Sequence, residues 1–403
     1  MPVQPLLTKP AAPPIWFLAL CTAISVVGLT ILTPILPMMA ESLGVSDAAV
    51  QSLLTAYLIA IAVGQLVCGP ISDRFGRRPV MLVGTILYCL GGLATSLTAD
   101  IDFLTLWRVV QGLGAAACMS MGRAIVNDVY ERSEAARQMS TISMVLAIAP
   151  ALSMVFGGII ADAAGWQATM ALLSGTGALA FFATWTLVTE TNQHPVTAVS
   201  LRSLFSAYRS VLSNSLFVYW TITSGMQIGV FFVLNGVLAY QYARHGYSMA
   251  EFGLWFALTP LSYLIGNSFN RSWFVARGIE RAAFIGCSLS LVSMLAMLFT
   301  QELGLTHALS LALPCAVFGF SNGIIVANTT VGAISALSRH AGTGSGIVGA
   351  WQMATGGIAG AIIVALGGAQ NFTIAASALV IMCVISVLSM LKVFLMMRKS
   401  SSN

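Results

Sequence analysis

Long runs of apolar residues recur along the chain and are separated by short polar segments; residues 80–97 and 374–391 are examples. An α-helix needs roughly 20 apolar residues to cross about 30 Å of hydrocarbon. A membrane β-barrel would instead show segments of roughly 10 residues with alternating polarity. The pattern therefore predicts transmembrane helices, whose backbone polar groups are satisfied within each segment.

Twelve such helices fit the chain, so we expect an all-α membrane protein. They are predicted at residues 15–38, 48–69, 80–98, 103–126, 140–162, 167–188, 215–240, 250–269, 282–300, 307–328, 343–367 and 371–396.

The longest polar stretch, residues 190–214, separates the sixth and seventh predicted helices. Its place near the middle of the chain favours a linker between two six-helix bundles; an ordinary long loop is the alternative. Within it, residues 202–212 are predicted to form an amphipathic helix on the inner membrane surface. The expected organisation is a cytoplasmic tail at 1–14, a bundle at 15–189, a cytoplasmic linker at 190–214, a bundle at 215–396 and a cytoplasmic tail at 397–403.

A short internal repeat supports two related halves. Residues 69–74 read Gly-Pro-Ile-Ser-Asp-Arg after the second predicted helix, and residues 266–271 read Gly-Asn-Ser-Phe-Asn-Arg after the eighth, an offset of 197 residues. Parallel duplication of a six-helix unit is a known plan of transporters. The repeat therefore predicts pseudo-symmetric bundles.

Basic residues predict the orientation, because loops rich in Lys and Arg stay on the cytoplasmic side. With the N-terminus inside, the outer segments hold only Arg244. The inner segments hold Lys9, Arg74, Arg77, Arg78, Arg132, Arg137, Arg202, Arg209, Arg271, Arg277, Arg281, Arg339, Arg398 and Lys399. Both termini are therefore expected in the cytoplasm.

Composition narrows the function classes. Of the 403 residues, 58% are hydrophobic and 8% charged, whereas soluble domains carry about 25% charged residues. This excludes a soluble enzyme, a secreted domain and a disordered chain. We find no catalytic constellation, Walker-type loop or metal-ligand pattern, so we expect no enzyme, no cofactor and no metal. The net charge of +5 fits contact with anionic membrane lipid rather than nucleic acid.

The most specific motif is the string Gly-Pro-Ile-Ser-Asp-Arg-Phe-Gly-Arg-Arg at residues 69–78. It predicts a tight turn between two helices, with its arginines facing cytosol and lipid phosphate. A simple basic anchor is the alternative, but the ordered Gly, Asp and Arg spacing favours a specific role.

This string resembles the motif between the second and third spans of the major facilitator superfamily, and the resemblance covers essentially the whole chain. Other features resemble the Bcr/CflA drug-resistance branch of drug:proton antiporters. They are Leu-Pro at 36–37, Gly-Gln at 64–65, Arg108 with residues 111–116, residues 123–128, and Ala-Gly-Thr-Gly-Ser at 341–345.

The resemblance implies a monomeric transporter of the bacterial inner membrane. It would export small organic compounds, drugs or metabolites, by alternating access in exchange for protons. An uncoupled facilitator or importer of a small polar metabolite is the alternative.

The resemblance also implies a conformational latch at the inner face. Asp73 would sit at the N-terminus of the eleventh span, near residues 342–345, where a helix dipole favours a carboxylate. Arg77 would pair with Asp128, and the cluster would hold the outward-open state. The alternative is that these charges only fix topology. The latch residues are Gly69, Asp73, Arg74, Gly76, Arg77, Arg78 and Asp128.

Proton coupling is the least determined property. Relatives in this branch carry an acid in the first span where this chain has Thr30, and no Asp or Glu lies in the middle of any predicted span. Arg108 matches the family's fourth-span coupling residue; an arginine at the outer interface, neutralised by Asp100 or Asp102, is the alternative. The coupling candidates are Arg108, Asp102, Asp128 and Asp73.

Polar and aromatic residues at helical spacing predict a substrate cavity suited to amphiphilic ligands. For each of them, a helix–helix hydrogen bond or core packing is the alternative, and for Arg123 snorkelling to the interface. The candidates are Thr30, Thr33, Tyr57, Gln65, Gln111, Met119, Arg123, Gln227, Phe231, Asn235, Trp255, Thr259, Tyr263, Asn322, Trp351 and Gln352.

The fifth predicted helix contains Pro150, Gly157 and Gly158, which should let it bend and approach the eighth helix closely. Exporters of this family carry Gly-Pro between that proline and the glycine pair. This chain has Ser153-Met154 there, a departure that weakens the resemblance to exporters without removing it.

Overall fold

The computed structural model describes residues 12–192, 201–274, 278–337 and 341–401, and this part of the chain contains helices but no strand. The helices of the first half are α1 (Ile15–Thr30), η1 (Thr33–Ile35), α2 (Leu36–Leu43), α3 (Asp47–Phe75), α4 (Arg77–Ser96), α5 (Ile101–Val129) and α6 (Arg132–Leu187). Those that follow are α7 (Leu201–Leu212), α8 (Ser215–Arg244), α9 (Met249–Phe256), α10 (Leu258–Phe269), η2 (Asn270–Phe274), α11 (Ile279–Glu302), α12 (Leu309–Ser335), α13 (Ala341–Ala365) and α14 (Phe372–Ser401).

The predicted all-α membrane fold is confirmed, with local differences. Ten helices in the described ranges are long and apolar enough to cross a membrane. The fifth and sixth predicted spans are both present: α6 contains two helices that meet where Gly165 leaves helical geometry at φ 81°. The eighth span is divided into α9 and α10, because Pro260 cannot donate to the carbonyl of Phe256, the last residue of α9.

Prolines also interrupt the first predicted span. The α-helix ends at Thr30, a short 3-10 turn follows, and helix resumes at Leu36. Pro34 and Pro37 occupy the first turns of the two later segments, where a missing N–H is tolerated. The predicted amphipathic helix at 202–212 is present as α7. The N-terminal tail to residue 11, residues 193–200 of the linker, and Arg277 and Arg339 lie outside the described residues.

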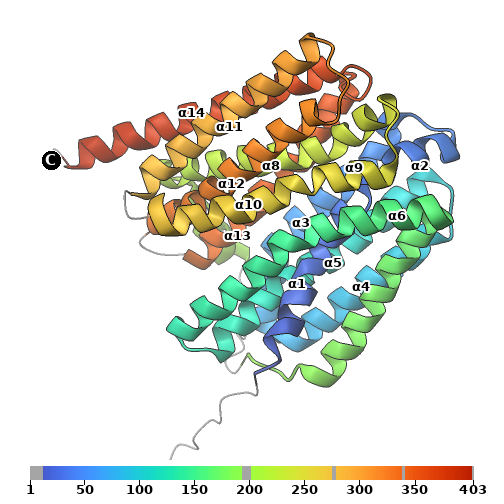
Figure 1. The fold of residues 1–403 in the computed structure, drawn as a ribbon. Coiled ribbons are helices and arrows are strands. Elements are labelled where there is room, and N and C mark those ends of the chain that lie inside the picture. Colours follow the sequence, from blue (N-terminus) through green and yellow to red (C-terminus); the bar gives the residue numbers. More distant parts are fainter. Residues whose placement is uncertain (1–11, 193–200, 275–277, 338–340, 402–403) are drawn as a thin grey trace, which may run out of the picture.

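The helices form two bundles (Figure 1). In the first, α5 packs against α3 and α4, and α1 and α4 pack against α6. In the second, α12 packs against α10 and α11, and α8 against α13 and α14. Close packing within the first bundle depends on glycine: any side chain at Gly114 would overlap the backbone of Gly84 and Tyr88 on α4.

The two bundles meet mainly through α3 with α13 and α6 with α9. We call the end that carries α2 and the start of α9 the α9 end, at the upper right of Figure 1. Here the Tyr240 hydroxyl donates to the Asp47 carbonyl over 3.4 Å, and the Gln370 amide donates to the Asp47 carboxylate over 3.0 Å. Hydrogen bonds therefore join the bundles at the α9 end.

Toward the opposite end, which carries α7 and the α3–α4 turn and which we call the linker end, the ribbons of the two bundles diverge (Figure 1). A methyl group added at Gly349 or Gly357 of α13 would touch Gln65 or Leu58 of α3. One added at Gly346, a turn nearer the linker end, would meet no heavy atom within 4 Å. The bundles are thus joined at the α9 end and diverge at the linker end.

Candidate functional site

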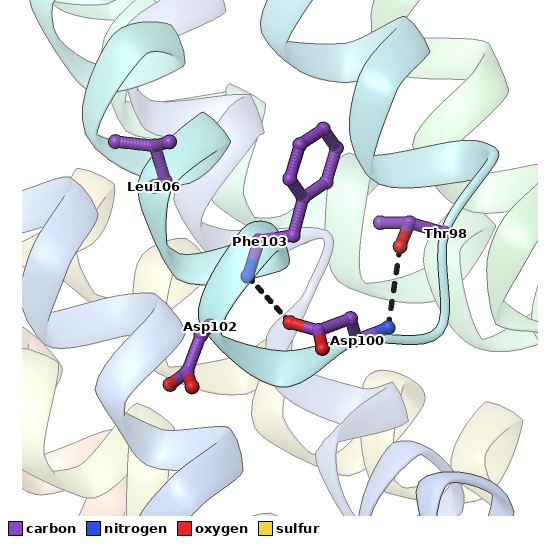
Figure 2. Close-up of a pocket in the computed structure, with 5 residues that line it drawn as sticks. All are labelled: Thr98, Asp100, Asp102, Phe103 and Leu106. Atoms are coloured by element: carbon purple, nitrogen blue, oxygen red, sulfur yellow. Dashed lines mark hydrogen bonds between the residues drawn. The ribbon is translucent and has the colours of Figure 1, made fainter.

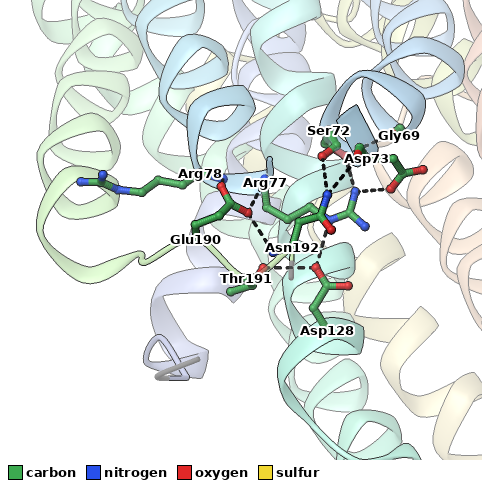
Figure 3. A network of polar contacts seen from close by, with 9 residues as sticks. All are labelled: Gly69, Ser72, Asp73, Arg77, Arg78, Asp128, Glu190, Thr191 and Asn192. Carbon is green, nitrogen blue, oxygen red and sulfur yellow. Dashed lines mark hydrogen bonds and ion pairs between the residues drawn. The ribbon is translucent and has the colours of Figure 1, made fainter. Parts of the chain in front are cut away.

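The turn between α3 and α4 gathers charges around Arg77 (Figure 3). Gly76 ends α3 with φ 100°, a conformation that favours glycine, and α4 begins at the next residue. The Arg77 guanidinium donates to Asp73 Oδ1 at 2.6 Å, to Asp128 Oδ2 at 2.9 Å and to the Ser72 hydroxyl. Its side chain is only 13% exposed, whereas Asp128 is 23% exposed, so water reaches the acids more readily than the guanidinium. The predicted pairing of Arg77 with Asp128 is present.

The first residues of the linker cap both helices of this turn. The Glu190 carboxylate accepts hydrogen bonds from the backbone N–H groups of Arg77 (2.9 Å) and Arg78 (3.2 Å), at the start of α4. A carboxylate at a helix N-terminus satisfies free donors and meets the positive end of the helix dipole. Glu190 therefore holds the N-terminus of α4.

The next two residues extend this cap, and we name residues 190–192 the clamp. The Asn192 amide donates to the carbonyls of Asp73 (2.8 Å) and Ser72 (3.3 Å), in the last turn of α3. The Thr191 hydroxyl donates to Asp128 Oδ2 at 3.1 Å. The sequence reasoning missed the clamp; an acid directly after the sixth span was the available signal.

Other residues of the motif face outward. Arg78 donates to the Trp185 carbonyl at 2.9 Å and lies over the Trp185 ring, and Arg74 lies over Phe75. The side chain of Asp73 is 47% exposed. Its predicted contact with residues 342–345 stays a prediction, because the surroundings of Gly342 lie outside the described residues.

Arg108 lies inside the first bundle, 1% exposed. It donates to Gln111 Oε1 at 2.6 Å and to the Gly28 carbonyl at 2.9 Å, and its guanidinium carbon lies 4.0 Å from the centre of the Tyr57 ring. In the described part of the chain no carboxylate bonds to it. The charge is held by a carbonyl, an amide and an aromatic face.

Neutralisation of Arg108 by Asp100 or Asp102 is therefore wrong. Asp100 instead caps α5 by accepting from the Phe103 N–H at 2.8 Å. Figure 2 shows Asp102 pointing away from that cap, in a surface depression of about 580 Å³ at the start of α5. Asp100 and Asp102 lie at the N-terminus of α5, whereas Arg108 lies about two turns further along this helix.

A pocket of about 210 Å³ lies between the bundles and receives residues from both. Its wall from the first bundle comes from α1 and α6, and its wall from the second comes from α8, α10, α12 and α13. The lining residues are Val26, Leu146, Pro150, Ile228, Phe231, Phe232, Thr259, Pro260, Tyr263, Phe318, Gly319, Asn322 and Met353.

Four predicted cavity residues meet in this pocket: Phe231, Thr259, Tyr263 and Asn322. The Thr259 hydroxyl and the Asn322 side-chain oxygen are buried and bond to no oxygen or nitrogen among the described residues, although the Cys315 thiol lies within reach of Thr259. An unpartnered buried polar atom costs about 1–3 kcal/mol. A ligand group that reached either atom would relieve this cost.

The remaining cavity candidates lie outside the lining, and several bond within their own bundle. Gln227 accepts from the Ser290 hydroxyl, Gln352 donates to Ser224, and Asn235 donates to a carbonyl of its own helix. Also outside the lining are Thr30, Thr33, Tyr57, Gln65, Gln111, Met119, Arg123, Trp255 and Trp351. The lining contains apolar residues that the polar pattern missed, including Phe232, Phe318 and Met353, which one sequence cannot separate from core packing.

The two departures from the family pattern contact each other. The hydroxyls of Thr30 in α1 and Ser153 in α6 lie 2.6 Å apart. Nearby on α6, the glycine pair lets other backbones approach: a methyl group at Gly157 would strike Ile31, and one at Gly158 would strike Met249 at the start of α9. The predicted close approach of the fifth and eighth spans is present.

Comparison with known proteins identifies the family. The sequence pattern of the Major Facilitator Superfamily matches residues 18–361. This chain belongs to that superfamily. It is therefore a multi-pass membrane transporter and not an enzyme.

Three curated relatives carry names of drug resistance. Multidrug resistance protein D of Escherichia coli is 30% identical over 85% of this chain and 86% of its own. The bicyclomycin resistance protein homolog of Haemophilus influenzae is 26% identical over 81% and 82%. The chloramphenicol resistance protein of Pseudomonas aeruginosa is 27% identical over 78% and 75%. The resemblance to the Bcr/CflA branch is thus confirmed.

Solved structures confirm the fold of this chain. A bacterial homolog of the human lysosomal transporter Spinster superposes with a TM-score of 0.72 at 15% identity, over 94% of this chain and 95% of its own. The POT family transporter PepTSo gives a TM-score of 0.74 at 12% identity, over 96% of this chain and 98% of its own.

Proposed function

We propose that this protein is a secondary active exporter of small organic compounds that alternates access between its two bundles and exchanges substrate for protons. The observation that carries the proposal is the pocket between the bundles, with its unpartnered Thr259 and Asn322 oxygens. The drug-resistance names of the relatives support export of drugs or metabolites. The protein would act as a monomer in the inner membrane, in contact with anionic lipid.

The charge network at the linker end is the proposed latch; its observed bonds join Arg77 to α3, α5 and residues 190–192, and its bond to the second bundle would form only in the outward-open state. Asp73 and Asp128 share Arg77, so protonation of either acid would weaken a charge-assisted bond. The clamp touches the same groups through Thr191 and Asn192. A change of protonation here would be transmitted to the linker that joins the bundles.

The membrane topology and the conformational state also belong to the proposal. Both termini and the linker lie in the cytoplasm, on the predicted domain boundaries, as the basic residues indicate. The bundles, joined at the α9 end and diverging at the linker end, would then be in a state that opens inward. Export requires the opposite state, in which the α9-end contacts separate.

The testing experiment uses liposomes that contain the purified protein, an imposed pH gradient and a pH-sensitive dye inside. A panel of drugs and small metabolites is added. We expect substrate-triggered proton movement, reduced at least tenfold in Asp73→Asn although this variant still inserts, because Arg77 loses a charged partner. Full activity of Asp73→Asn would overturn the latch.

Substrate flux without proton movement would support the second candidate, an uncoupled facilitator or importer. The absence of any acid in the middle of the predicted spans favours it, since proton exchange needs a titratable group that both sides can reach. Flux of no compound in the panel would overturn the transport proposal itself.

A further inference from the structure

We propose that the substrates of the pocket between the bundles are uncharged amphiphilic compounds, and that the pocket discriminates against organic cations. The inference rests on the proposed function, since it names the substrate class of the same pocket. It is carried by the charge pattern around the pocket, which is neutral at the lining and positive behind it.

None of the thirteen lining residues is ionised at neutral pH. Their polar side-chain atoms belong to Thr259, Tyr263 and Asn322, all on α10 and α12, while the wall from the first bundle is apolar. A bound cation would lose its hydration and meet aromatic rings but no carboxylate; cation–π attraction offsets only part of the cost of burying an unpaired charge. A neutral amphiphile can place a ring against the apolar wall and a polar group against α10 and α12.

Behind the apolar wall, Thr30 occupies the position where relatives of this branch carry an acid, and its hydroxyl lies against that of Ser153. The two hydroxyls lie 2.6 Å apart, and each is also within hydrogen-bond distance of a carbonyl of a lining residue, Val26 or Pro150; their two protons serve two of these three contacts. These bonds satisfy both hydroxyls within the wall. The wall therefore presents no acid, and no free hydroxyl from this pair, to a ligand.

The buried charge on this side is positive. Arg108 bonds to the carbonyl of Gly28 on α1, the helix that also carries the lining residue Val26. Gly28 faces Tyr57 and Tyr88 inside the first bundle, so the guanidinium lies behind α1 as seen from the pocket. No carboxylate in the described part of the chain bonds to the guanidinium, so its field is not cancelled locally. In a medium of low dielectric constant this field repels a cation in the pocket.

The same charge does not make the pocket an anion site. Arg108 is 1% exposed, and its donors already face Gln111 and Gly28. The unpartnered atoms of the pocket are a hydroxyl and an amide oxygen, and an amide oxygen only accepts hydrogen bonds. These groups suit a neutral ligand that carries a donor, such as an alcohol or an amide.

The test is binding of three matched probes to the purified full-length protein, by titration calorimetry. The probes share one aryl ring and differ in the attached group: a primary amide, a trimethylammonium and a sulfonate. We expect the neutral probe to bind at least tenfold more tightly than either charged probe. Equal or tighter binding of the cation or the anion, or failure of the neutral probe to bind, would overturn the inference.

A charge introduced into the pocket tests the cause. Asn322→Asp keeps the side-chain shape and should strengthen binding of the cationic probe at least tenfold. Asn328→Asp is the matched control: it lies on the same helix, bonds to Asn270 and is outside the lining, so it should leave the preference unchanged. An unchanged preference in Asn322→Asp would contradict the inference. Absence of flux across the liposome panel would separately contradict the proposed function.

Discussion

Arg108 shows how a buried charge can be kept without an acid. Two charge-assisted hydrogen bonds, to Gln111 and to the Gly28 carbonyl, and the face of Tyr57 take the place of a counter-ion. Only a planar guanidinium can make both bonds and stack at the same time. The position therefore requires arginine specifically, whatever its part in coupling.

Replacement Arg108→Lys should lower the free energy of unfolding by about 2 kcal/mol, because lysine keeps the charge but loses one charge-assisted bond and the stacking. Transport should fall at least tenfold. Thermal unfolding in detergent and liposome flux measure the two effects. Arg209→Lys, on the exposed face of α7, is the matched control and should resemble the wild type; a stable, active Arg108→Lys would show that the charge alone suffices.

At this scale the sequence could predict candidates but not their partners. The pairing of Arg77 with Asp128 followed from a recognised motif. The contact between Thr30 and Ser153 spans 123 positions, and no local pattern links them. Of sixteen cavity candidates, four lie in the pocket, because polar residues inside a bundle also serve helix–helix contacts.

At the scale of elements, glycines set how closely the helices of the first bundle pack. Gly114 of α5 lies directly against the backbone of α4, whereas Gly175 of α6 has no heavy atom within 4 Å of an added methyl group. The same substitution should therefore have opposite effects at the two positions.

Gly114→Ala should destabilise the protein by about 1–3 kcal/mol, since α4 and α5 must move apart. Gly175→Ala should be neutral or stabilise by up to about 1 kcal/mol, because alanine favours helix. Melting of the purified variants in one detergent compares them. Equal melting temperatures would contradict the close approach of α4 and α5.

The clamp lies more than a hundred residues along the chain from the α3–α4 turn that it caps. Glu190→Gln should destabilise the turn by about 1 kcal/mol, because the helix dipole and two backbone donors lose a full charge. Transport should decrease several-fold if the clamp holds Arg77 in place. Glu302→Gln, at the end of α11, is the control for loss of a surface acid. Unaltered stability and flux in Glu190→Gln would reduce the clamp to a passive contact.

At the scale of the whole molecule, the hydrogen bonds of Asp47 at the α9 end should break in each transport cycle. In the double variant with Asp47→Cys and Gln370→Cys, we expect a short thiol cross-linker to abolish transport. Cleavage of the cross-link should restore it. The native cysteines are free thiols but give little background, since five of the seven are buried and the other two, Cys68 and Cys89, are partly buried. Flux measured before and after cross-linking gives the result.

A within-bundle link is the control for this experiment. Thr373 donates to Glu302 at 3.2 Å, and both lie in the second bundle. Cross-linked Glu302→Cys with Thr373→Cys should keep transporting. Continued transport by the Asp47–Gln370 link would contradict alternating access through the α9 end.

The membrane class, the number of spans and the family could be predicted from the sequence, because twenty-residue apolar runs and an ordered turn motif are local properties. Helix bounds were predicted less well, since Pro34 and Pro260 each divide a span. In addition, α6 begins at Arg132 instead of residue 140, and α12 ends at Ser335 instead of residue 328. Which polar side chains face the pocket, what holds Arg108, and the capping of α3 and α4 by the start of the linker all depend on the tertiary structure. Those are contacts between distant segments, and the packing of whole helices fixes them.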